Sequence, residues 1–227
     1  MSRLFTFGCS FTNYRWSTWA DCLAPEFDYF ENWGQSGGGN HFIFNSIMEC
    51  DQRHNFGVED TVVVCWSSTQ RDDRYVQNKW HTLGNVFNCP IYDPAYLKEY
   101  VEERGYLIRD LAFMKAAKTL LESRLGLTWK FLSMIEPNDT DDTRDVTKLY
   151  QNVVDSIAPS YYNILFKNAW PDRDGDPHPS PEEHLAYLDA VLPGWVTKES
   201  TRVIMREESI NLSKNSRKSG MTKVTRL

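Results

Sequence analysis

The sequence predicts an α/β domain in which helices cover both faces of a mostly parallel sheet. Apolar, β-prone segments alternate along the chain with segments of helical periodicity, as they do in such folds. The strongest strand signal is TVVVCW at 61–66, an unbroken apolar run in which four of six residues are β-branched. The chain has 227 residues, of which 41% are hydrophobic and 14% aromatic, so it can bury a sizeable core and global disorder is excluded.

Each predicted element has its own sequence signal. Strand character and bounding turns predict strands at 3–8, 27–33, 61–66 and 129–134. Helical patterning predicts helices at 14–24, 41–52, 106–125, 146–157 and 181–192. The helix at 106–125 carries its apolar residues on one stripe, formed by Leu107, Leu111, Met114, Ala117 and Leu121. The last helix has Ser180 as N-cap, Pro181 at its first position and Glu183 in the capping-box position.

These elements predict one domain over residues 1–210, with 71–125 as an insertion that combines an aromatic-rich segment and the long helix. We expect the aromatic residues of 75–106 to pack this insertion onto the core, although they would also suit a sugar-stacking cleft or a lid.

The charge distribution argues against a nucleic-acid function. The net charge is −6, yet residues 211–227 hold five basic side chains and no acidic one, so the remaining body is strongly acidic. Phosphate binding needs clustered Lys and Arg, which the body lacks. The basic tail is expected to be a solvated, mobile end, with contact to an acidic partner as the alternative.

Targeting and cysteine patterns place the chain among soluble proteins made in the cytoplasm. No run of about 18 apolar residues is present, and the N-terminus lacks the features of a signal peptide. The five cysteines are an odd number without CxxC spacing, which predicts reduced thiols and neither a disulfide framework nor a zinc knuckle.

Four loops carry residues suited to acyl transfer, and the first follows the first strand directly. In Gly8-Cys9-Ser10-Phe11-Thr12, Ser10 would expose its hydroxyl beside backbone amides that can stabilise an oxyanion. The alternative is that Ser10 caps a helix starting near residue 13. Cys9 is a competing nucleophile, but alternation along the chain would point it the opposite way.

The second and third loops supply possible oxyanion donors. The glycines of the turn at 32–40 (NWGQSGGGN) let backbone amides approach a ligand closely. The turn could instead cradle a phosphate, although it lacks the GxGxxG order and the lysine of a P-loop. It could also be a plain turn between a strand and a helix. The segment 66–72 (WSSTQRD) offers hydroxyls at a strand end, either as donors or as caps.

The fourth loop, at 172–181 (DRDGDPHPSP), places His178 among carboxylates in a Pro-rigid segment, which suits a general base with its orienting acid. A calcium loop is the rival interpretation, since Asp172, Asp174, Asp176 and Glu183 match EF-hand positions 1, 3, 5 and 12, but Pro177 occupies the glycine position. The third interpretation is a plain surface loop without a chemical role. His184 either packs near the site or is a half-buried helix residue.

Taken together, Gly8-x-Ser10, Asn32-x-Gly34-x-x-Gly37 and the Asp-Pro-His178-Pro-Ser loop resemble the SGNH (GDSL-type) hydrolase superfamily, over about residues 3–192. The FTFGCSFT opening and HPSPEEHLAYL resemble divergent SGNH-like proteins of tailed phages. The resemblance implies a three-layer α/β/α, flavodoxin-like domain with a small parallel sheet, and neither a metal nor an organic cofactor.

The resemblance also implies roles for single residues. Ser10 would attack an ester carbonyl, His178 would remove its proton, and the amides of Ser10 and Gly37 with a third donor would stabilise the oxyanion. Two positions depart from the family pattern. Ser68 falls where the family has an oxyanion Asn, so Ser68 or Arg71 would be the third donor. Gly175 falls where the family has its acid, so Asp176, or else Asp174, would orient His178.

The expected function is therefore a serine esterase or deacylase acting on a small-molecule or carbohydrate-linked ester, with no nucleic-acid or membrane partner. The alternative is a non-catalytic interaction or virion-associated protein on the same scaffold. For a phage-encoded chain, the location would be the host cytoplasm or the virion.

Overall fold

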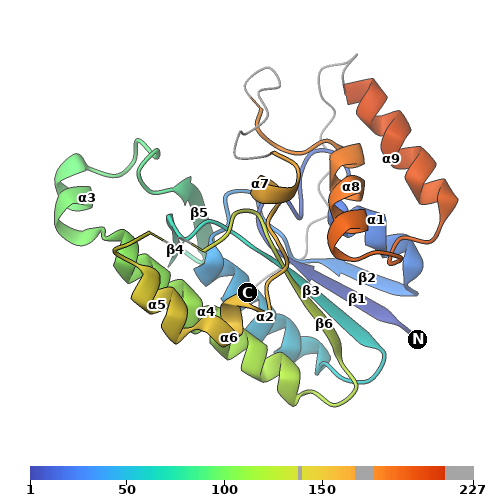
Figure 1. The fold of residues 1–227 in the computed structure, drawn as a ribbon, viewed down its shortest axis with the longest axis horizontal. Coiled ribbons are helices and arrows are strands. Elements are labelled where there is room, and N and C mark those ends of the chain that lie inside the picture. Colours follow the sequence, from blue (N-terminus) through green and yellow to red (C-terminus); the bar gives the residue numbers. More distant parts are fainter. Residues whose placement is uncertain (138–139, 167–175, 213–227) are drawn as a thin grey trace.

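The structure is a computed structural model that describes residues 1–137, 140–166 and 176–212. Its centre is a four-stranded, fully parallel sheet with strand order β2-β1-β3-β6 (Figure 1). The strands are β1 (Arg3–Phe7), β2 (Tyr29–Asn32), β3 (Asp60–Trp66) and β6 (Thr128–Ser133), so all four predicted strands are present.

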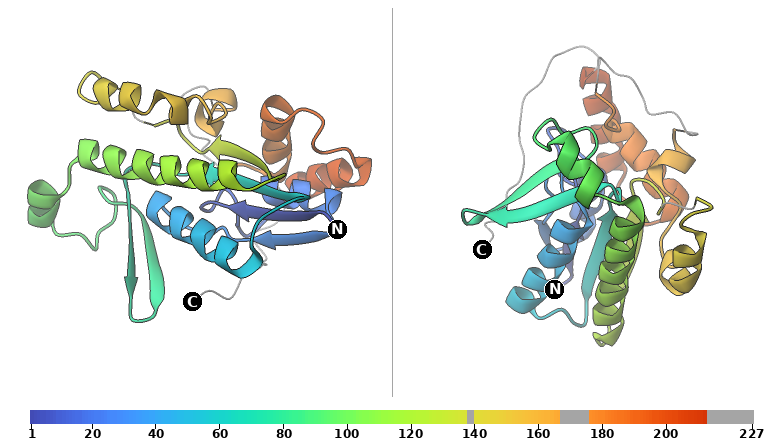
Figure 2. Two further views of the ribbon diagram at one scale, coloured as in Figure 1. Left: turned by 90° about the horizontal axis from the view of Figure 1, so that it is seen from below. Right: turned by 90° about the vertical axis from the view of Figure 1, so that its left-hand side faces the viewer.

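Helices cover both faces of this sheet (Figure 2), which confirms the predicted three-layer α/β/α class. One face packs against α1 (Trp19–Leu23), α8 (Pro181–Val191) and α9 (Glu199–Leu212). The other packs against α2 (Asn40–His54), α4 (Glu103–Ser123), α5 (Arg144–Leu149) and α6 (Gln151–Val154). No helix in the described ranges is long and apolar enough to cross a membrane.

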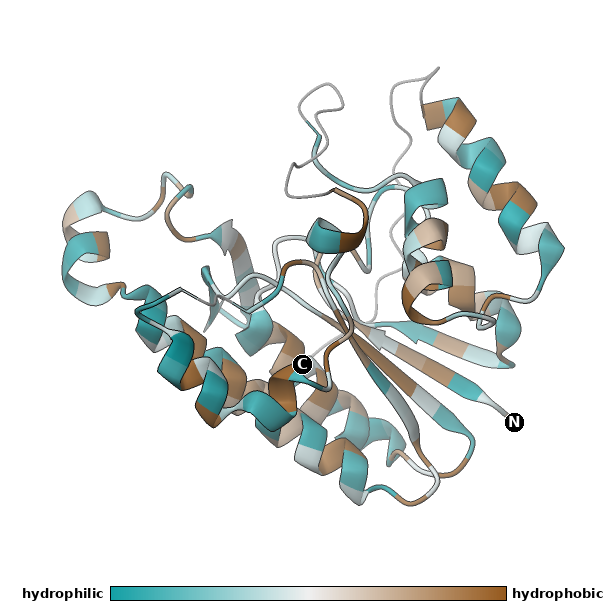
Figure 3. Ribbon diagram, viewed as in Figure 1, coloured by the Kyte–Doolittle hydropathy of each residue, from teal (hydrophilic) through white to brown (hydrophobic). Residues whose placement is uncertain are grey.

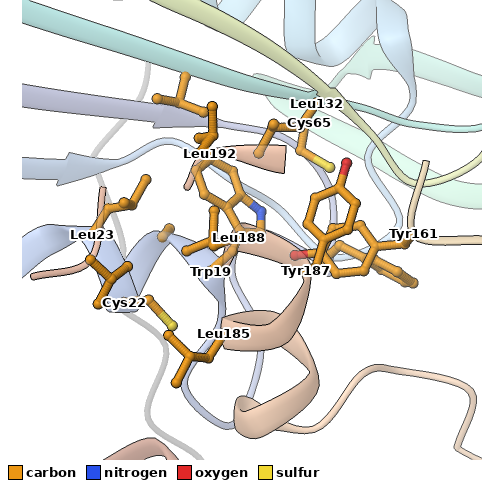
Figure 4. Packing of buried hydrophobic residues seen from close by; sticks show 14 of the residues in the cluster. Trp19, Cys22, Leu23, Cys65, Leu132, Tyr161, Leu185, Tyr187, Leu188 and Leu192 are labelled. Carbon is orange, nitrogen blue, oxygen red and sulfur yellow. The ribbon is translucent and has the colours of Figure 1, made fainter. Parts of the chain in front are cut away.

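Alternation along the strands divides the core into two clusters. In β3, Val63 and Cys65 belong to the α1/α8 cluster, whereas Val62, Val64 and Trp66 belong to the α2/α4 cluster. Because both faces are covered, every residue of β3 is buried, and the central strands are predominantly apolar (Figure 3). Figure 4 shows the α1/α8 cluster, where Trp19, Leu185 and Leu188 pack below the sheet residues.

Several predicted helices have different bounds. The helix expected at 14–24 comprises only α1, followed by a 3₁₀ turn at Ala24–Glu26. Thr18 and Asp21 form a capping box that fixes the start of α1 at Trp19, so residues 14–18 are not helical. The helix expected at 146–157 is the two short helices α5 and α6, and α7 (Tyr161–Ile164) and α9 were not anticipated.

Residues 71–125 contain two unlike parts. The first is an antiparallel hairpin of β4 (Arg71–Val76) and β5 (Lys79–Asn85), followed by α3 (Pro94–Tyr100), which projects beyond the sheet (Figure 1). The second is α4, whose predicted apolar stripe is fully buried in the α2/α4 cluster. The helix thus belongs to one of the helical layers that cover the sheet. The described part of the predicted tail is only the end of α9, and 213–227 lie outside the described residues.

The aromatic residues of the hairpin and α3 only partly follow the expected core packing. Trp80 is packed against the α2/α4 cluster, edge-on to Phe42. Tyr75 and Tyr100, by contrast, are exposed, and Tyr96 stacks between Tyr92 and Tyr100 outside both clusters. The expectation was therefore wrong for these tyrosines, because the hairpin leaves the sheet surface instead of lying along it.

We expect Leu188→Ala to lower the free energy of unfolding by about 2–5 kcal/mol, because Leu188 is fully buried in the α1/α8 cluster and truncation leaves a cavity. Leu125→Ala is the matched control. Because Leu125 is 86% exposed, this substitution should change the free energy of unfolding by less than about 0.5 kcal/mol. Denaturant unfolding of both variants measures the difference, and equal losses would contradict the assignment of the core.

Candidate active site

The turn after β1 holds Ser10 at the carboxyl end of the sheet, where sites of parallel α/β folds lie. The amides of Thr12 and Asn13 both donate to the carbonyl of Cys9, which closes the turn. Gly8 is required here, because a Cβ at that position would lie 2.0 Å from Thr12 Oγ1 and 2.9 Å from the carbonyl oxygen of Cys65. No helix begins at this turn, so the interpretation of Ser10 as a helix cap is wrong.

Ser10 and Cys9 point to opposite environments, as alternation predicts. Cys9 is fully buried in the α1/α8 cluster, with its thiol 3.9 Å from the sulfur of Met134. The Ser10 hydroxyl contacts His178. A thiol buried among apolar side chains is poorly placed to react with a substrate, which leaves Ser10 as the candidate nucleophile of this turn.

Three side chains from the two ends of the sequence form a hydrogen-bonded chain. Ser10 Oγ lies 2.8 Å from His178 Nε2, and His178 Nδ1 lies 2.7 Å from Asp176 Oδ1. Since an ionised carboxylate only accepts hydrogen bonds, Nδ1 carries the proton and Nε2 is left to accept the hydroxyl proton of Ser10. The backbone amide of His178 also donates to Asp176 Oδ1, at 3.1 Å, which fixes the two residues relative to each other.

The second carboxylate oxygen of Asp176 is held by the segment that follows the Ser10 turn. The Tyr14 hydroxyl donates to Asp176 Oδ2 at 2.9 Å, and Arg15 forms an ion pair with the same oxygen. The Tyr14 ring also stacks on the His178 imidazole, with 3.9 Å between centroids and 17° between planes. Tyr14 and Arg15 thus orient the acid, and Tyr14 orients the base as well.

The electrostatics keep Asp176 ionised and His178 neutral near pH 7. Burial favours the neutral acid, but hydrogen bonds from His178 and Tyr14 outweigh it, so the pKa of Asp176 lies below its usual range. Burial has the largest effect on the pKa of His178 and lowers it, because the charged imidazolium is poorly solvated. The carboxylate of Asp176 acts in the opposite direction, and the positive charges of Arg71 and Arg15 lower the pKa further. His178 is thus able to accept a proton.

The other interpretations of the 172–181 loop can be compared with the residues described. Asp172 and Asp174, which the calcium interpretation and the alternative acid require, lie outside the described residues. Asp176 and Glu183, the other two calcium ligands of that interpretation, have other partners: Asp176 binds His178, Tyr14 and Arg15, and Glu183 caps α8 by accepting from the Ser180 amide. This part of the loop does not converge on a cation.

The glycine turn lies beside the Ser10 turn and beneath the hairpin. The Gln35 amide donates to the carbonyl of Gly8, which joins the two turns. Gly37 has a φ of +76° and fits so tightly that a Cβ would lie 2.3 Å from the carbonyl oxygen of Thr82. Within the described residues, neither the Ser10 amide nor the Gly37 amide donates a hydrogen bond, so both are available to a ligand.

The predicted third donor, Ser68, lies in the loop after β3, where its hydroxyl accepts from the Gln70 amide at 3.2 Å. Within the described part of the chain, no interaction joins Ser68 to Ser10 or His178. Arg71 extends from the start of β4 instead, and donates to the carbonyl of Gly38 at 2.9 Å. Of the two, Arg71 is the residue that contacts the glycine turn.

Two other groups of titratable side chains lie apart from Ser10. His184 is fully buried and shares a hydrogen bond of 2.9 Å with the Tyr161 hydroxyl, so it is a core residue. Glu31, Cys50 and His54 lie close enough together to hold a metal ion. Glu31, however, already accepts hydrogen bonds from Trp33 and Tyr29. Burial raises the pKa of the Cys50 thiol far above its usual range, which disfavours the thiolate that a divalent cation needs, so these residues fit such a cation poorly.

Sequence reasoning missed Tyr14 and Arg15. Both lay in the helix predicted at 14–24, which hid them as ordinary helix residues. The signal that separates them is the Thr18-x-x-Asp21 pattern, which begins the helix at Trp19 and leaves 14–17 outside it.

Comparisons with known proteins give likenesses of fold at low identity. The acetylxylan esterase Axe2 from Geobacillus stearothermophilus has a TM-score of 0.47 and 17% identity, with 87% of this chain and 97% of that chain covered. The α/β hydrolase LAE5 from the metagenome of Lake Arreo has a TM-score of 0.45 and 14% identity, with the same coverage. A member of the lipolytic G-D-S-L family from Veillonella parvula has a TM-score of 0.36 and 12% identity, covering 94% and 99%. No family model and no curated protein matches the sequence.

We expect His178 to titrate below its ordinary pKa of 6.5, because burial disfavours the imidazolium. Asp176→Asn should lower this pKa further, since the carboxylate charge that stabilises the imidazolium is lost. Histidine NMR over a pH series measures both values, and His178→Gln identifies the resonance among the five histidines. A pKa above 6.5, or a rise on Asp176→Asn, would contradict the described electrostatics.

Proposed function

We propose that this protein is a serine hydrolase that cleaves carboxylic esters through an acyl-serine intermediate. The observation that carries the proposal is the chain of hydrogen bonds from Ser10 Oγ through His178 to Asp176, at 2.8 and 2.7 Å. Nucleophile, base and orienting acid in this order form the general arrangement of serine hydrolases on unrelated folds.

Acylation begins when Ser10 Oγ attacks the ester carbonyl while its proton moves to His178 Nε2. The carbonyl π electrons move to the oxygen, which becomes an oxyanion facing the amides of Ser10 and Gly37. When the intermediate collapses, the bond to the leaving alkoxide breaks and His178 returns the proton to it. The free alcohol departs, and the acyl group stays on Ser10.

Deacylation repeats these steps with water as the nucleophile. His178 takes a proton from water as its oxygen attacks the acyl-serine carbonyl, and then returns this proton to Ser10 Oγ. The products are a carboxylic acid and an alcohol, and the protein is unchanged. Asp176 stays ionised throughout and stabilises the imidazolium that forms in each half-reaction.

The substrate class is proposed as an ester with a small acyl group, and carbohydrate-linked esters are included in the screen. Ser10 is only 4% exposed, and the His178 ring that its hydroxyl contacts is flanked by the rings of Tyr14 and Phe11. Such a recessed hydroxyl favours short acyl groups over long chains. Acetate esters of phenols and of sugars are therefore the first substrates to test.

We expect the wild type to hydrolyse p-nitrophenyl acetate and Ser10→Ala to lose this activity, because the attacking oxygen is removed. His178→Ala should lower kcat by about 10²- to 10⁴-fold, the usual contribution of a general base. Ser123→Ala is the matched control, since this exposed serine lies at the end of α4 and its hydroxyl donates to the carbonyl of Leu120. Full activity in Ser10→Ala would contradict the proposed mechanism.

A binding function is the second candidate, and the surface of the hairpin and α3 favours it. Ile91 and Tyr100 are 70% and 65% exposed, and a hollow of about 410 Å³ is lined by Arg74, Tyr92 and Tyr96 among others. Exposed apolar patches of this kind often bind partners. A folded wild type that hydrolyses no ester would leave this function as the better account.

A further inference from the structure

We infer that Arg71 is a catalytic residue whose guanidinium donates to the oxyanion formed at the Ser10 adduct. This inference rests on the proposed ester hydrolysis. It concerns the third hydrogen-bond donor to the oxyanion, beside the backbone amides of Ser10 and Gly37.

The position of Arg71 is the first argument. Its Nη1 donates to the carbonyl of Gly38, the residue after the proposed donor Gly37. Its Nη2 lies 3.6 Å from the sulfur of Met134, which in turn contacts the thiol of Cys9, the residue before Ser10. The guanidinium thus contacts the glycine turn directly and is one residue, Met134, removed from the backbone segment that carries Ser10. Its charge is also one of those that lower the pKa of His178, after burial, so the guanidinium acts electrostatically on the imidazole.

The unsatisfied charge of Arg71 is the second argument. Two neighbouring arginines have carboxylate partners, Arg74 with Asp72 at 2.9 Å and Arg109 with Asp110 at 2.7 Å. Arg71 has no carboxylate within 4 Å among the described residues, and its buried Nε has no hydrogen-bond partner among them. The carboxylate of Asp73 is near enough for its charge to interact with that of Arg71, but the two form no ion pair. A negative charge that develops during the reaction would give the guanidinium a direct partner.

The rigidity of the backbone on both sides of Arg71, the first residue of β4, is the third argument. Asn40 binds both backbone groups of Ser67, accepting from its amide at 2.8 Å and donating to its carbonyl at 3.1 Å. Arg109 donates to the backbone carbonyl of Arg71 at 2.8 Å. The carboxylate of Asp73, two residues after Arg71, accepts hydrogen bonds from the amides of Gly39 and Phe42 at the start of α2. A donor fixed before the reaction needs little reorganisation in the transition state.

The test compares Arg71→Met and Arg71→Lys with wild type in hydrolysis of a neutral acetate ester. Losing one oxyanion donor should lower kcat about 10²- to 10³-fold in Arg71→Met, with KM little changed, because the interaction forms mainly in the transition state. Arg71→Lys keeps the positive charge but lacks the planar guanidinium, so its kcat should lie between those of wild type and Arg71→Met. Arg104→Gln is the matched control and should keep wild-type kcat, because Arg104 pairs with Asp145 on α5.

A pH profile separates catalysis from loop stability. Removing the Arg71 charge should raise the pKa of His178, so the acidic limb of kcat/KM moves to higher pH in Arg71→Met, which a merely structural role would not produce. If Arg71→Met fails to fold by circular dichroism, Arg71→Gln, which also lacks the charge, replaces it in this comparison, and Arg71→Lys should show no shift. Rescue of Arg71→Ala by millimolar guanidinium would further support the inference.

The outcomes distinguish the two proposals. Ser10-dependent hydrolysis with unchanged kcat in Arg71→Met would overturn the role of Arg71 alone. An effect confined to KM for esters that carry a carboxylate would also overturn it, because Arg71 would then bind the substrate's own charge. A wild type without Ser10-dependent hydrolysis would overturn both the proposed function and this inference.

Discussion

The two oxygens of Asp176 join the two ends of the chain, and the geometry of the site depends on that junction. One oxygen holds His178, and the other is held by Tyr14 and Arg15, which are more than 160 positions away in the sequence. The imidazole is thereby fixed at its edge by the acid and on its face by the Tyr14 ring. With its ring fixed in this way, His178 directs Nε2 at the Ser10 hydroxyl.

The parallel sheet makes this junction possible. β1 and β3 are adjacent and parallel, so the Ser10 turn and the loop that carries Arg71 emerge at the same edge. α8 reaches that edge from the other end of the chain, because its capping box of Ser180 and Glu183 places the N-cap two residues after His178. Trp16 reinforces this contact by donating to the carbonyl of Pro179 at 2.7 Å.

Much of the fold was predictable because its signals are local. The β-branched run of β3, the apolar stripe of α4 and the capping box of α8 each determine an element without reference to the rest of the chain. The association of Ser10 with His178 was predicted by motif order, whereas the partners of the second oxygen of Asp176 were not. Tyr14 and Arg15 belong to an irregular segment without periodicity, so only the packed structure shows what they contact. The projecting hairpin was missed for a related reason, since its strands carry mixed polar and aromatic residues instead of a clear alternation.

The central claim is that Ser10 is an activated nucleophile, and covalent labelling tests it most directly. Wild type, Ser10→Ala and His178→Ala would each be incubated with a fluorophosphonate probe, followed by intact-mass measurement and peptide mapping. We expect one adduct on wild type, mapped to Ser10, no adduct on Ser10→Ala and strongly slowed labelling of His178→Ala. A folded wild type that acquires no adduct, or an adduct that persists in Ser10→Ala, would contradict the claim.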